Sequence, residues 1–293
     1  MLAELKHKIP QTWYPYLLPP YQRVRKRIEQ LDRVLDKRTL SQAKFIEALT
    51  KLGFTPGATV YVYSAFSKIK RRVLNISPEN LIRILQELVG PEGTLLMPTY
   101  SFRGSQAEYA DAHTHFDVQK TPSQVGVLTE VFRTTPGVVR SLHPTHSVAA
   151  WGRHAQDLIS THHLGSTFGA TSPLYKLRDY NGLVIGLGAR YRYGFGPTHV
   201  PEEINTKARE LAFEERPRRM ILIDGSREIP YEFRVFRRGV SREYERIEKI
   251  MLREKILRYF TVGGLELTVG NADAFIARGL ELAEENNYIL RER

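Results

Sequence analysis

Short apolar segments alternate with amphipathic ones along most of the chain. Runs rich in β-branched, aliphatic and aromatic residues are typical of buried strands, and they recur at 59–63, 93–97, 147–151 and 182–187. Between them, apolar residues recur at every third or fourth position, as on one face of a helix. This alternation indicates a layered α/β/α sandwich around a mixed, largely parallel sheet that is buried on both faces.

Capping residues predict where several helices begin and end. Ser77 followed by Pro78 is an N-cap with proline at the first helical position, and Gly90 ends that helix. Thr121-Pro122-Ser123 predicts a helix that runs through Phe132, and Ser172-Pro173 opens a short one. Further helices are expected at 242–257 and 271–285, with strand-like residues between them.

A hairpin is predicted where Asp224-Gly225 separates Arg219–Ile223 from Ile229–Phe236, because Asp-Gly is a strong turn signal between apolar runs. No repeat or flexible linker interrupts this part of the chain. We therefore expect a single domain over residues 41–293.

The first 40 residues have a different pattern. They open with prolines and aromatic residues, including Pro10 and Trp13, which are poor formers of disorder. Tyr21–Asp36 then has the spacing of an amphipathic helix. We expect residues 1–40 to form an arm and a helix that pack on the body.

Composition excludes several classes of protein. There is no cysteine, which excludes a disulfide scaffold, a thiolate zinc site, a cysteine nucleophile and an iron–sulfur cluster. No apolar run approaches the roughly 20 residues of a membrane span, and the N-terminus lacks a signal-peptide core. We expect a cytoplasmic protein that does not bind membranes.

The chain is strongly basic, with a formal net charge of +11 and a pI of about 9.7. Such a balance is typical of proteins that meet nucleic acid or another polyanion. The basic residues are scattered, however, and no zinc-finger, homeodomain or RNA-binding signature is present. We therefore expect no nucleic-acid partner, and both a solvated basic surface and a dedicated anionic ligand stay open.

The sequence lacks three common motifs of nucleotide-binding proteins and serine hydrolases. Gly186-Leu-Gly188 follows an apolar run, but Tyr191 occupies the position of the third glycine of a dinucleotide fingerprint. No P-loop sequence and no Gly-x-Ser-x-Gly elbow occurs.

Eight of the nine histidines lie between His113 and His199. Pairs such as His113-x-His115 and His143-x-x-His146 could ligate zinc, but neither forms His-Glu-x-x-His. We expect no metal, and a histidine–metal hydrolase remains only as a rival hypothesis.

Two polar segments lie next to predicted strands: residues 140–147 lead into the strand at 147–151, and residues 196–203 come after the strand at 182–187. Residues 140–147 join a cation, hydroxyls and imidazoles, and residues 196–203 place His199 beyond the strand at 182–187. Ligands of open α/β sheets bind at the carboxyl ends of strands, and an imidazole there can accept a proton near neutral pH. Alternatively, His199 only caps the helix that follows it.

At these segments the sequence resembles the aminoglycoside 3-N-acetyltransferase family, antibiotic N-acetyltransferases unrelated to the GNAT superfamily. The likeness runs from about Ser41 to Leu282, and its most specific part is the stretch from Gly126 to Gly152. Residues 89–99 and 168–174 add to it. The resemblance implies the non-GNAT acetyltransferase fold of that family.

The resemblance also implies a reaction and its catalytic residues. An acetyl group passes directly from acetyl-CoA, the co-substrate, to a primary amine, usually on an amino sugar. His199 matches the family's general base, Glu202 stands three residues after it, and Thr198 stands immediately before it. Glu232 is expected to orient the base, with Glu203 and Glu243 as competitors.

The family likeness places the pantetheine arm and phosphates of CoA against three segments. These are the loop after the first strand, the end of the second strand and the segment 140–147, with contacts expected from Ser64, Ala65, Phe66, Ser67, Pro98, Thr99, Arg140, Ser141, His143, Pro144 and Ser147.

The chain departs from the family pattern in ways that affect the substrate. Tyr63–Ser67 replaces a common His-Ser-Ser-Leu-Ser, and Lys70-Arg71-Arg72 follows where glycine is usual. The threonine that usually precedes the base by three residues is Gly196 here. A net charge of +11 suits CoA phosphates better than a polycationic antibiotic, so we expect an acceptor amino sugar from glycan or secondary metabolism.

An alternative from another class is a catalytically silent protein that binds CoA or a sugar phosphate on the same scaffold. A nucleic-acid-binding protein is a weaker rival. The sequence leaves a homodimer open.

Overall fold

The computed structural model describes residues 38–285, 288, 290 and 291. Residues Leu40–Arg293 form one compact unit, close to the predicted domain boundary. The arm and helix expected within residues 1–37 lie outside the described residues.

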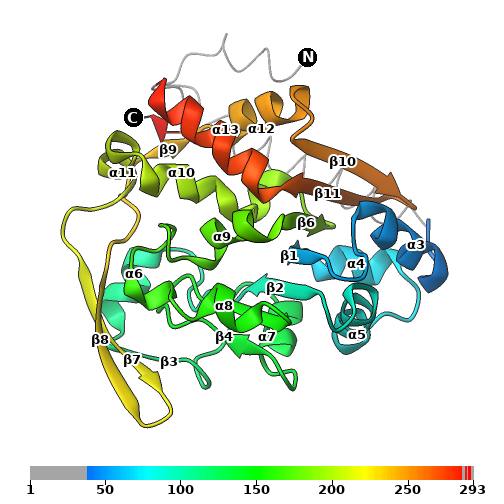
Figure 1. Ribbon diagram of the computed structural model, residues 1–293, viewed down its shortest axis with the longest axis horizontal. Helices are drawn as coiled ribbons and strands as arrows, with labels where there is room; N and C mark the ends of the chain where they lie inside the picture. The colour runs from blue at the N-terminus through cyan, green and yellow to red at the C-terminus, as the bar shows by residue number, and fades with distance from the viewer. Residues whose placement is uncertain (1–37, 286–287, 289, 292–293) are drawn as a thin grey trace, which may run out of the picture. The chain divides into compact units, whose positions relative to one another are not determined.

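A seven-stranded mixed sheet forms the centre of this unit (Figure 1). Its three middle strands, β6, β1 and β2, are parallel, and antiparallel strands flank them on both sides. The expected mixed α/β architecture is confirmed. In sheet order the strands are β10 (Leu257–Val262), β11 (Leu265–Asn271), β6 (Leu183–Leu187), β1 (Thr59–Ser64), β2 (Thr94–Pro98), β5 (Val148–Gly152) and β4 (Val139–Arg140).

The two-residue period of the strands builds a separate core on each face of the sheet. On β1, Tyr61 and Tyr63 enter one apolar cluster, whereas Val60 and Val62 enter the other. Helices cover both clusters, so the layered α/β/α arrangement follows from burial of both faces. On the tyrosine side lie α8 (Ala155–Ile159), α9 (Pro173–Lys176), α10 (His199–Ile204), α12 (Tyr244–Arg253) and α13 (Ala272–Glu284). On the valine side lie α3 (Gln42–Leu52), α4 (Phe66–Arg72), α5 (Pro78–Val89) and α7 (Val127–Arg133).

The predicted caps hold at α5, where the Ser77 hydroxyl accepts the N–H of Asn80 at 3.1 Å and Gly90 follows the last turn. The helix expected from residue 121 begins later, at Val127. Gly126 has a φ of +141°, so helical geometry does not extend back through it. Similarly, α12 ends at Arg253 rather than at residue 257, because Lys255 has a φ of +60° and Leu257 already pairs in β10.

A smaller sheet of β3 (His115–Asp117), β7 (Arg218–Asp224) and β8 (Arg227–Phe233) stands beside α6 (Gln106–Ala112), as Figure 1 shows. The predicted hairpin is confirmed as β7 and β8, which turn at Gly225. The remaining elements are α11 (Thr206–Ala212), the two-stranded ribbon of β9 (Ser241–Arg242) and β12 (Leu290–Arg291), and the 3₁₀ turns η3 (His162–Leu164), η4 (Leu177–Tyr180), η5 (Tyr191–Tyr193) and η6 (Gly196–Thr198).

Among the helices of the described residues, none combines the length and the apolar character needed to cross a membrane.

Parallel pairing brings several loops to one edge of the sheet. The carboxyl ends of β1, β2 and β6 meet there, and β5 starts beside the end of β2. The segments that leave or enter at this edge are 64–67, 98–105, 141–147 and 188–199. They contain most of the polar residues that the sequence predicts for function.

Candidate active site

His199 stands at the first position of α10, directly after the turn η6. Close packing fixes this approach. A side chain at Gly196 would come within 2.8 Å of Leu174 and 3.3 Å of the Tyr61 hydroxyl. A threonine at position 196, where the family resemblance would place one, therefore requires the Leu174 side chain to move.

His199 and Glu202 form a hydrogen-bonded pair on one turn of α10. Their separation is 3.1 Å between Nδ1 and Oε2. A carboxylate accepts hydrogen bonds, so Nδ1 carries the proton and, in the neutral ring, Nε2 is the atom with a free lone pair. The Glu202 side chain is 0% exposed and that of His199 is 19% exposed. The carboxylate is thus enclosed while the ring reaches the surface.

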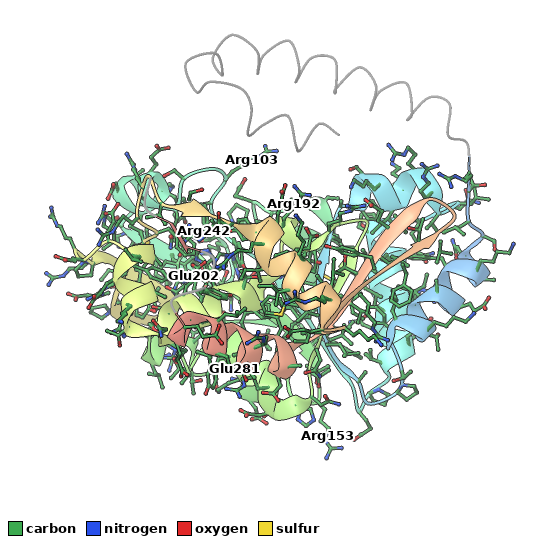
Figure 2. The ribbon with its side chains drawn as sticks, turned by 90° about the horizontal axis from the view of Figure 1, so that it is seen from above. Arg103, Arg153, Arg192, Glu202, Arg242 and Glu281 are labelled. Atoms are coloured by element: carbon green, nitrogen blue, oxygen red, sulfur yellow. The ribbon has the colours of Figure 1, made fainter. Side chains whose placement is uncertain are left out.

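Arg242 holds the same carboxylate from β9 (Figure 2). Its Nε lies 3.0 Å from Oε1 of Glu202, and its Nη2 lies 3.0 Å from Oε2. Burial raises the pKa of Glu202, but the charges and hydrogen bonds of His199 and Arg242 outweigh burial and hold that pKa below its usual range. Glu202 is therefore an anion shared by a guanidinium and an imidazole.

Two phenylalanines, which also stack on each other, pack against the imidazole. The ring centroids of Phe168 and Phe236 lie 5.1 and 5.0 Å from that of His199. The guanidinium of Arg242 stacks on the same Phe236 ring, 4.4 Å from its centroid. His146 packs against both phenylalanines as well, at 4.9 and 5.7 Å. The segment 140–147 thus meets the His199 turn through shared aromatic neighbours.

The structure places the predicted Thr198 and Glu232 away from the roles expected for them. The hydroxyl of Thr198 donates to Tyr191 at 3.2 Å, and its carbonyl accepts from the Tyr288 hydroxyl at 2.5 Å, so Thr198 fixes the turn rather than the base. Glu232 is exposed on β8 and accepts from Arg219 Nε at 2.5 Å. Glu202 holds His199 instead of Glu232, because it is one helical turn away on the same face.

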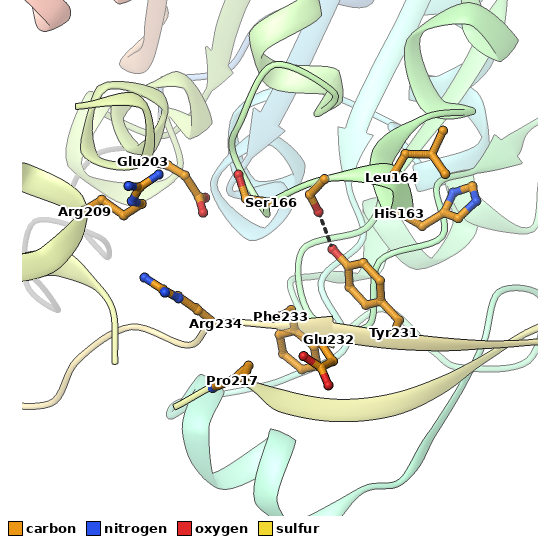
Figure 3. Close-up of a pocket in the computed structure, with 11 residues that line it drawn as sticks. His163, Leu164, Ser166, Glu203, Arg209, Pro217, Tyr231, Glu232, Phe233 and Arg234 are labelled. Atoms are coloured by element: carbon orange, nitrogen blue, oxygen red, sulfur yellow. Dashed lines mark hydrogen bonds between the residues drawn. The ribbon is translucent and has the colours of Figure 1, made fainter. Parts of the chain in front are cut away.

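Glu203, a competitor for that role, points into a separate cavity of about 650 Å³. Its Oε2 accepts the N–H of Phe168 at 2.7 Å, and burial raises its pKa. Figure 3 shows Glu203 and Arg209 facing Tyr231 across this cavity, where Tyr231 donates to the Gly165 carbonyl at 2.8 Å.

Arg140 ties several loops together from inside the protein. Its guanidinium donates to the carbonyls of Val118, Thr121 and Thr99 and to the hydroxyl of Ser147. Burial lowers the pKa of Arg140 to about 9. Arg140 also borders a cavity of about 690 Å³ whose other cations, Arg133 and Arg227, pair with acidic neighbours. Its predicted contact with CoA phosphates stays a prediction.

His143, Ser141 and His162 form a buried polar network. Nδ1 of His143 accepts the N–H of His146 at 3.0 Å, and its Nε2 lies 3.2 Å from the Thr167 hydroxyl. The Ser141 hydroxyl lies 2.9 Å from His162 Nδ1. Burial lowers the pKa of His143, His146 and His162, so all three rings are neutral at pH 7.

Most side chains that the family likeness places against CoA turn inward. His143, Ser147 and Thr99 are fully buried, and their polar atoms bond inside the protein. Pro98 is buried in β2, and the Pro144 carbonyl accepts from Ser101. Burial gives these side chains an internal structural role, and their direct contacts with CoA stay predictions.

The loop after β1, which the resemblance places against CoA, is at least partly exposed. Ser64, Ala65 and Phe66 are half-buried and Ser67 is exposed. The N–H of Ala65 donates to the Leu187 carbonyl at 2.9 Å, which anchors this loop to the end of β6. It remains the predicted CoA-binding loop, at the edge of the sheet where the segment before His199 also begins.

In the described part of the chain, no three histidine or acidic side chains are arranged so that they could hold a metal ion. His113 bonds to the Tyr109 carbonyl at 2.8 Å, and His115 lies 2.8 Å from the Thr114 hydroxyl.

The sequence did not point to Arg242 or Phe236. Both lie more than thirty residues from His199 in the chain, on segments with no motif. Only β9 and the loop after β8 bring them to α10. A lone arginine in a basic chain gives no signal by which this contact could be found.

Comparison with known proteins gives one family. The family model described as aminoglycoside 3-N-acetyltransferase matches residues 62–284. The aminoglycoside N(3')-acetyltransferase-like protein YokD of Bacillus subtilis is 30% identical over 179 residues, which cover 55% of this chain and 65% of that protein. Aminoglycoside N(3)-acetyltransferase VII of Streptomyces paromomycinus is 30% identical over 201 residues, covering 64% and 68%. For aminoglycoside N(3)-acetyltransferase IV of Salmonella the aligned part spans 53% of the relative.

Solved structures show the same fold. The aminoglycoside acetyltransferase AAC(3)-Xa superposes with a TM-score of 0.72 at 25% identity, over 88% of this chain and 99% of that one. A complex described as AAC-IIIb binary with CoASH superposes with a TM-score of 0.68 at 23% identity, over 85% of this chain and 97% of that one.

Replacing Arg140 with methionine should destabilise the protein strongly, because it leaves the carbonyls of Val118 and Thr121 without their donor and removes one of the two donors of the Thr99 carbonyl. At about 1–3 kcal/mol for each unsatisfied group, we expect a loss of about 3 kcal/mol or more in the free energy of unfolding, measured by urea denaturation. Arg153→Met, which removes an exposed ion pair with Glu92, should change it by less than about 1 kcal/mol. Equal stability of the two variants would contradict the internal role of Arg140.

Stability should fall as the pH drops below about 6.5, because the unfolded chain then protonates histidines that the folded protein keeps neutral. Each of His143, His146 and His162 adds up to about 1.4 kcal/mol per pH unit. Glu203, whose pKa is raised, makes stability increase as the pH falls, but this single carboxyl opposes the three histidines. Urea denaturation between about pH 5 and 7.5 measures the slope. Exposed His115→Gln should keep it, and a flat profile would refute the buried neutral state.

Proposed function

The chain belongs to the aminoglycoside 3-N-acetyltransferase family, and from that premise we propose that it transfers the acetyl group of acetyl-CoA to a primary amine on an amino sugar. His199 is the general base in this proposal, and Glu202 holds its ring in the required tautomer. The observation that carries the proposal is the hydrogen bond of His199 Nδ1 to the enclosed carboxylate, which leaves Nε2 directed away from Glu202.

The proposed reaction needs one base and no covalent enzyme intermediate. An amine is mostly protonated at pH 7, so a proton must leave its nitrogen before or during attack. The ammonium first releases one proton to solvent, and Nε2 of His199 then takes a second proton from the nitrogen as the neutral amine attacks the thioester carbonyl carbon. The carbon–sulfur bond then breaks, the acetamide forms, and the CoA thiolate recovers the proton. Binding both substrates together supplies the orientation that the direct transfer requires.

We assign CoA to the loop Ser64–Ser67 and to the cations of α4, which include Lys68, Lys70 and Arg71. These side chains are at least partly exposed at the sheet edge, whereas the segment 140–147 is enclosed. A solved structure with the same fold is described as a binary complex with CoASH, which supports CoA as the ligand of this chain.

The acceptor is proposed to be less cationic than an aminoglycoside. Acidic side chains near Arg242 are matched by arginines: Glu202 by Arg242, Glu243 by Arg246 and Glu245 by Arg192. A polycation needs free carboxylates for charge-assisted hydrogen bonds. The arginine partners and the net charge of +11 instead favour an amino sugar that carries a phosphate.

His199→Ala should lower kcat about 10²- to 10⁴-fold and leave the Kd for CoA within about twofold, because the base is lost while the cofactor loop is untouched. In the wild type, the rate should fall at acidic pH, because general-base catalysis needs an unprotonated base. Thiol release measures kcat in the variant and the pH dependence of the rate in the wild type. The protein adds no background to this assay because it has no cysteine. Unchanged turnover in the variant, or a flat pH profile, would favour the silent binding protein.

Glucosamine phosphates and nucleotide-linked amino sugars should give a higher kcat/KM than gentamicin, by about tenfold or more, since only the latter must bring several uncompensated positive charges to a basic surface. The same thiol assay compares the acceptors at matched ionic strength. Raising the salt should narrow the difference, because screening weakens the electrostatic term. Rapid acetylation of gentamicin at micromolar concentration would show the charge argument to be mistaken.

A further inference from the structure

We propose that Arg242 is a positioning residue for the His199–Glu202 pair: it fixes both oxygens of the carboxylate, so that one orientation of the imidazole remains. This inference rests on the proposed function for its kinetic consequences, but its geometric content stands on the contacts of Arg242 alone.

The geometry of the contact restrains the carboxylate on two atoms. Nε of Arg242 donates to Oε1 of Glu202 at 3.0 Å, and Nη2 donates to Oε2 at 3.0 Å. Such a two-pronged contact prevents the carboxylate from rotating about its last bond. The remaining acceptor position of Oε2 then faces Nδ1 of His199 at 3.1 Å. Without this two-pronged contact, the Glu202 carboxylate could rotate away from His199, and the imidazole would no longer be restricted to one tautomer.

Arg242 is itself held in place by elements other than α10. Its backbone pairs with Leu290 in the β9–β12 ribbon. Its guanidinium lies 4.4 Å from the centroid of Phe236, and that ring also contacts His199. The arginine side chain is only 13% exposed. One aromatic ring thus sets the position of both the base and the cation that aligns its partner.

Charge gives a second reason for an arginine at this position. An unpaired carboxylate in the interior would favour the protonated imidazolium of His199, which cannot act as a base. Arg242 balances the charge of Glu202, so the neutral ring remains compatible with an ionised carboxylate.

The other groups around the pair supply no compensating charge. They are Glu203 on α10, which is buried with a raised pKa, His146, which is neutral, and Tyr191, Tyr244 and Tyr288, whose pKa values burial raises. Arg242 is the cation that hydrogen-bonds to Glu202 among the described residues.

Arg242→Lys tests the two-pronged contact with Glu202, because lysine keeps the positive charge but cannot present two fixed donors. Arg242→Gln tests the charge, because it keeps a donor and loses the cation. We expect kcat to fall about tenfold or more in both while the KM for acetyl-CoA stays within about twofold. In Arg242→Gln the acid limb of the pH–rate profile should also move to higher pH. A matched control is Arg278→Lys, which alters a similar two-pronged pair with Glu254 and should change none of these quantities.

A double-mutant cycle shows whether Arg242 acts through Glu202. Adding Arg242→Gln to Glu202→Gln should cause no further loss of kcat, because the carboxylate that Arg242 aligns is already gone. The comparison of Glu202→Gln with the double variant also tests the proposal if the single Arg242 variants do not fold, because the double variant removes both buried charges together. A further loss of kcat in the double variant would overturn the proposal.

Nitrogen-15 NMR of histidine-labelled protein separates this inference from the proposed function. The wild type should show His199 protonated at Nδ1, and Arg242→Lys should show a mixture of tautomers, whatever reaction the protein performs. Absence of acetyl transfer in the wild type would remove the proposed function alone. An unchanged tautomer together with unchanged kcat in Arg242→Lys would remove the role of Arg242.

Discussion

The enclosed carboxylate of Glu202 is the constraint on which the candidate site depends. A buried anion without partners would cost several kcal/mol, so the fold must surround it with donors. It does so with one imidazole from the same helical turn and one guanidinium from β9. The first contact defines the tautomer of His199, and the second prevents the carboxylate from moving. The energetic demand of one buried charge thus produces an oriented base.

The signature segment 140–147 contributes in a different way from the one its composition suggests. Its cation, hydroxyls and imidazoles bond to one another and to neighbouring backbone, and they are almost wholly buried. Buried polar groups that satisfy each other make a rigid, specific layer. His146 at the end of this layer packs on Phe168 and Phe236, which also contact His199. The segment therefore shapes the wall against which the base is placed.

The basic character of the chain has two separate structural sources. Some arginines act inside the protein, where Arg140 binds loop carbonyls and Arg242 binds Glu202. Others, such as Lys70 and Arg71 on α4, lie exposed beside the loop after β1. The exposed group is the one positioned to meet an anionic ligand directly, because Arg242 is already paired with Glu202 and Arg140 is enclosed by its hydrogen-bond acceptors. Net charge alone does not distinguish these two uses.

The sequence by itself determined the alternating elements, the hairpin at Gly225 and the sheet edge at which the candidate site lies. These depend on periods and spacings within a few residues, which the backbone geometry of strands and helices fixes. The family resemblance, not the spacing, pointed to His199 and Glu202, and it favoured Glu232 as the residue that orients the base. Only the tertiary structure decided that Arg242 rather than another cation meets Glu202, that Glu232 pairs with Arg219, and that His143 is enclosed. Those outcomes join residues from separate elements, and their partners are chosen by packing and by the cost of leaving a buried polar group unpaired.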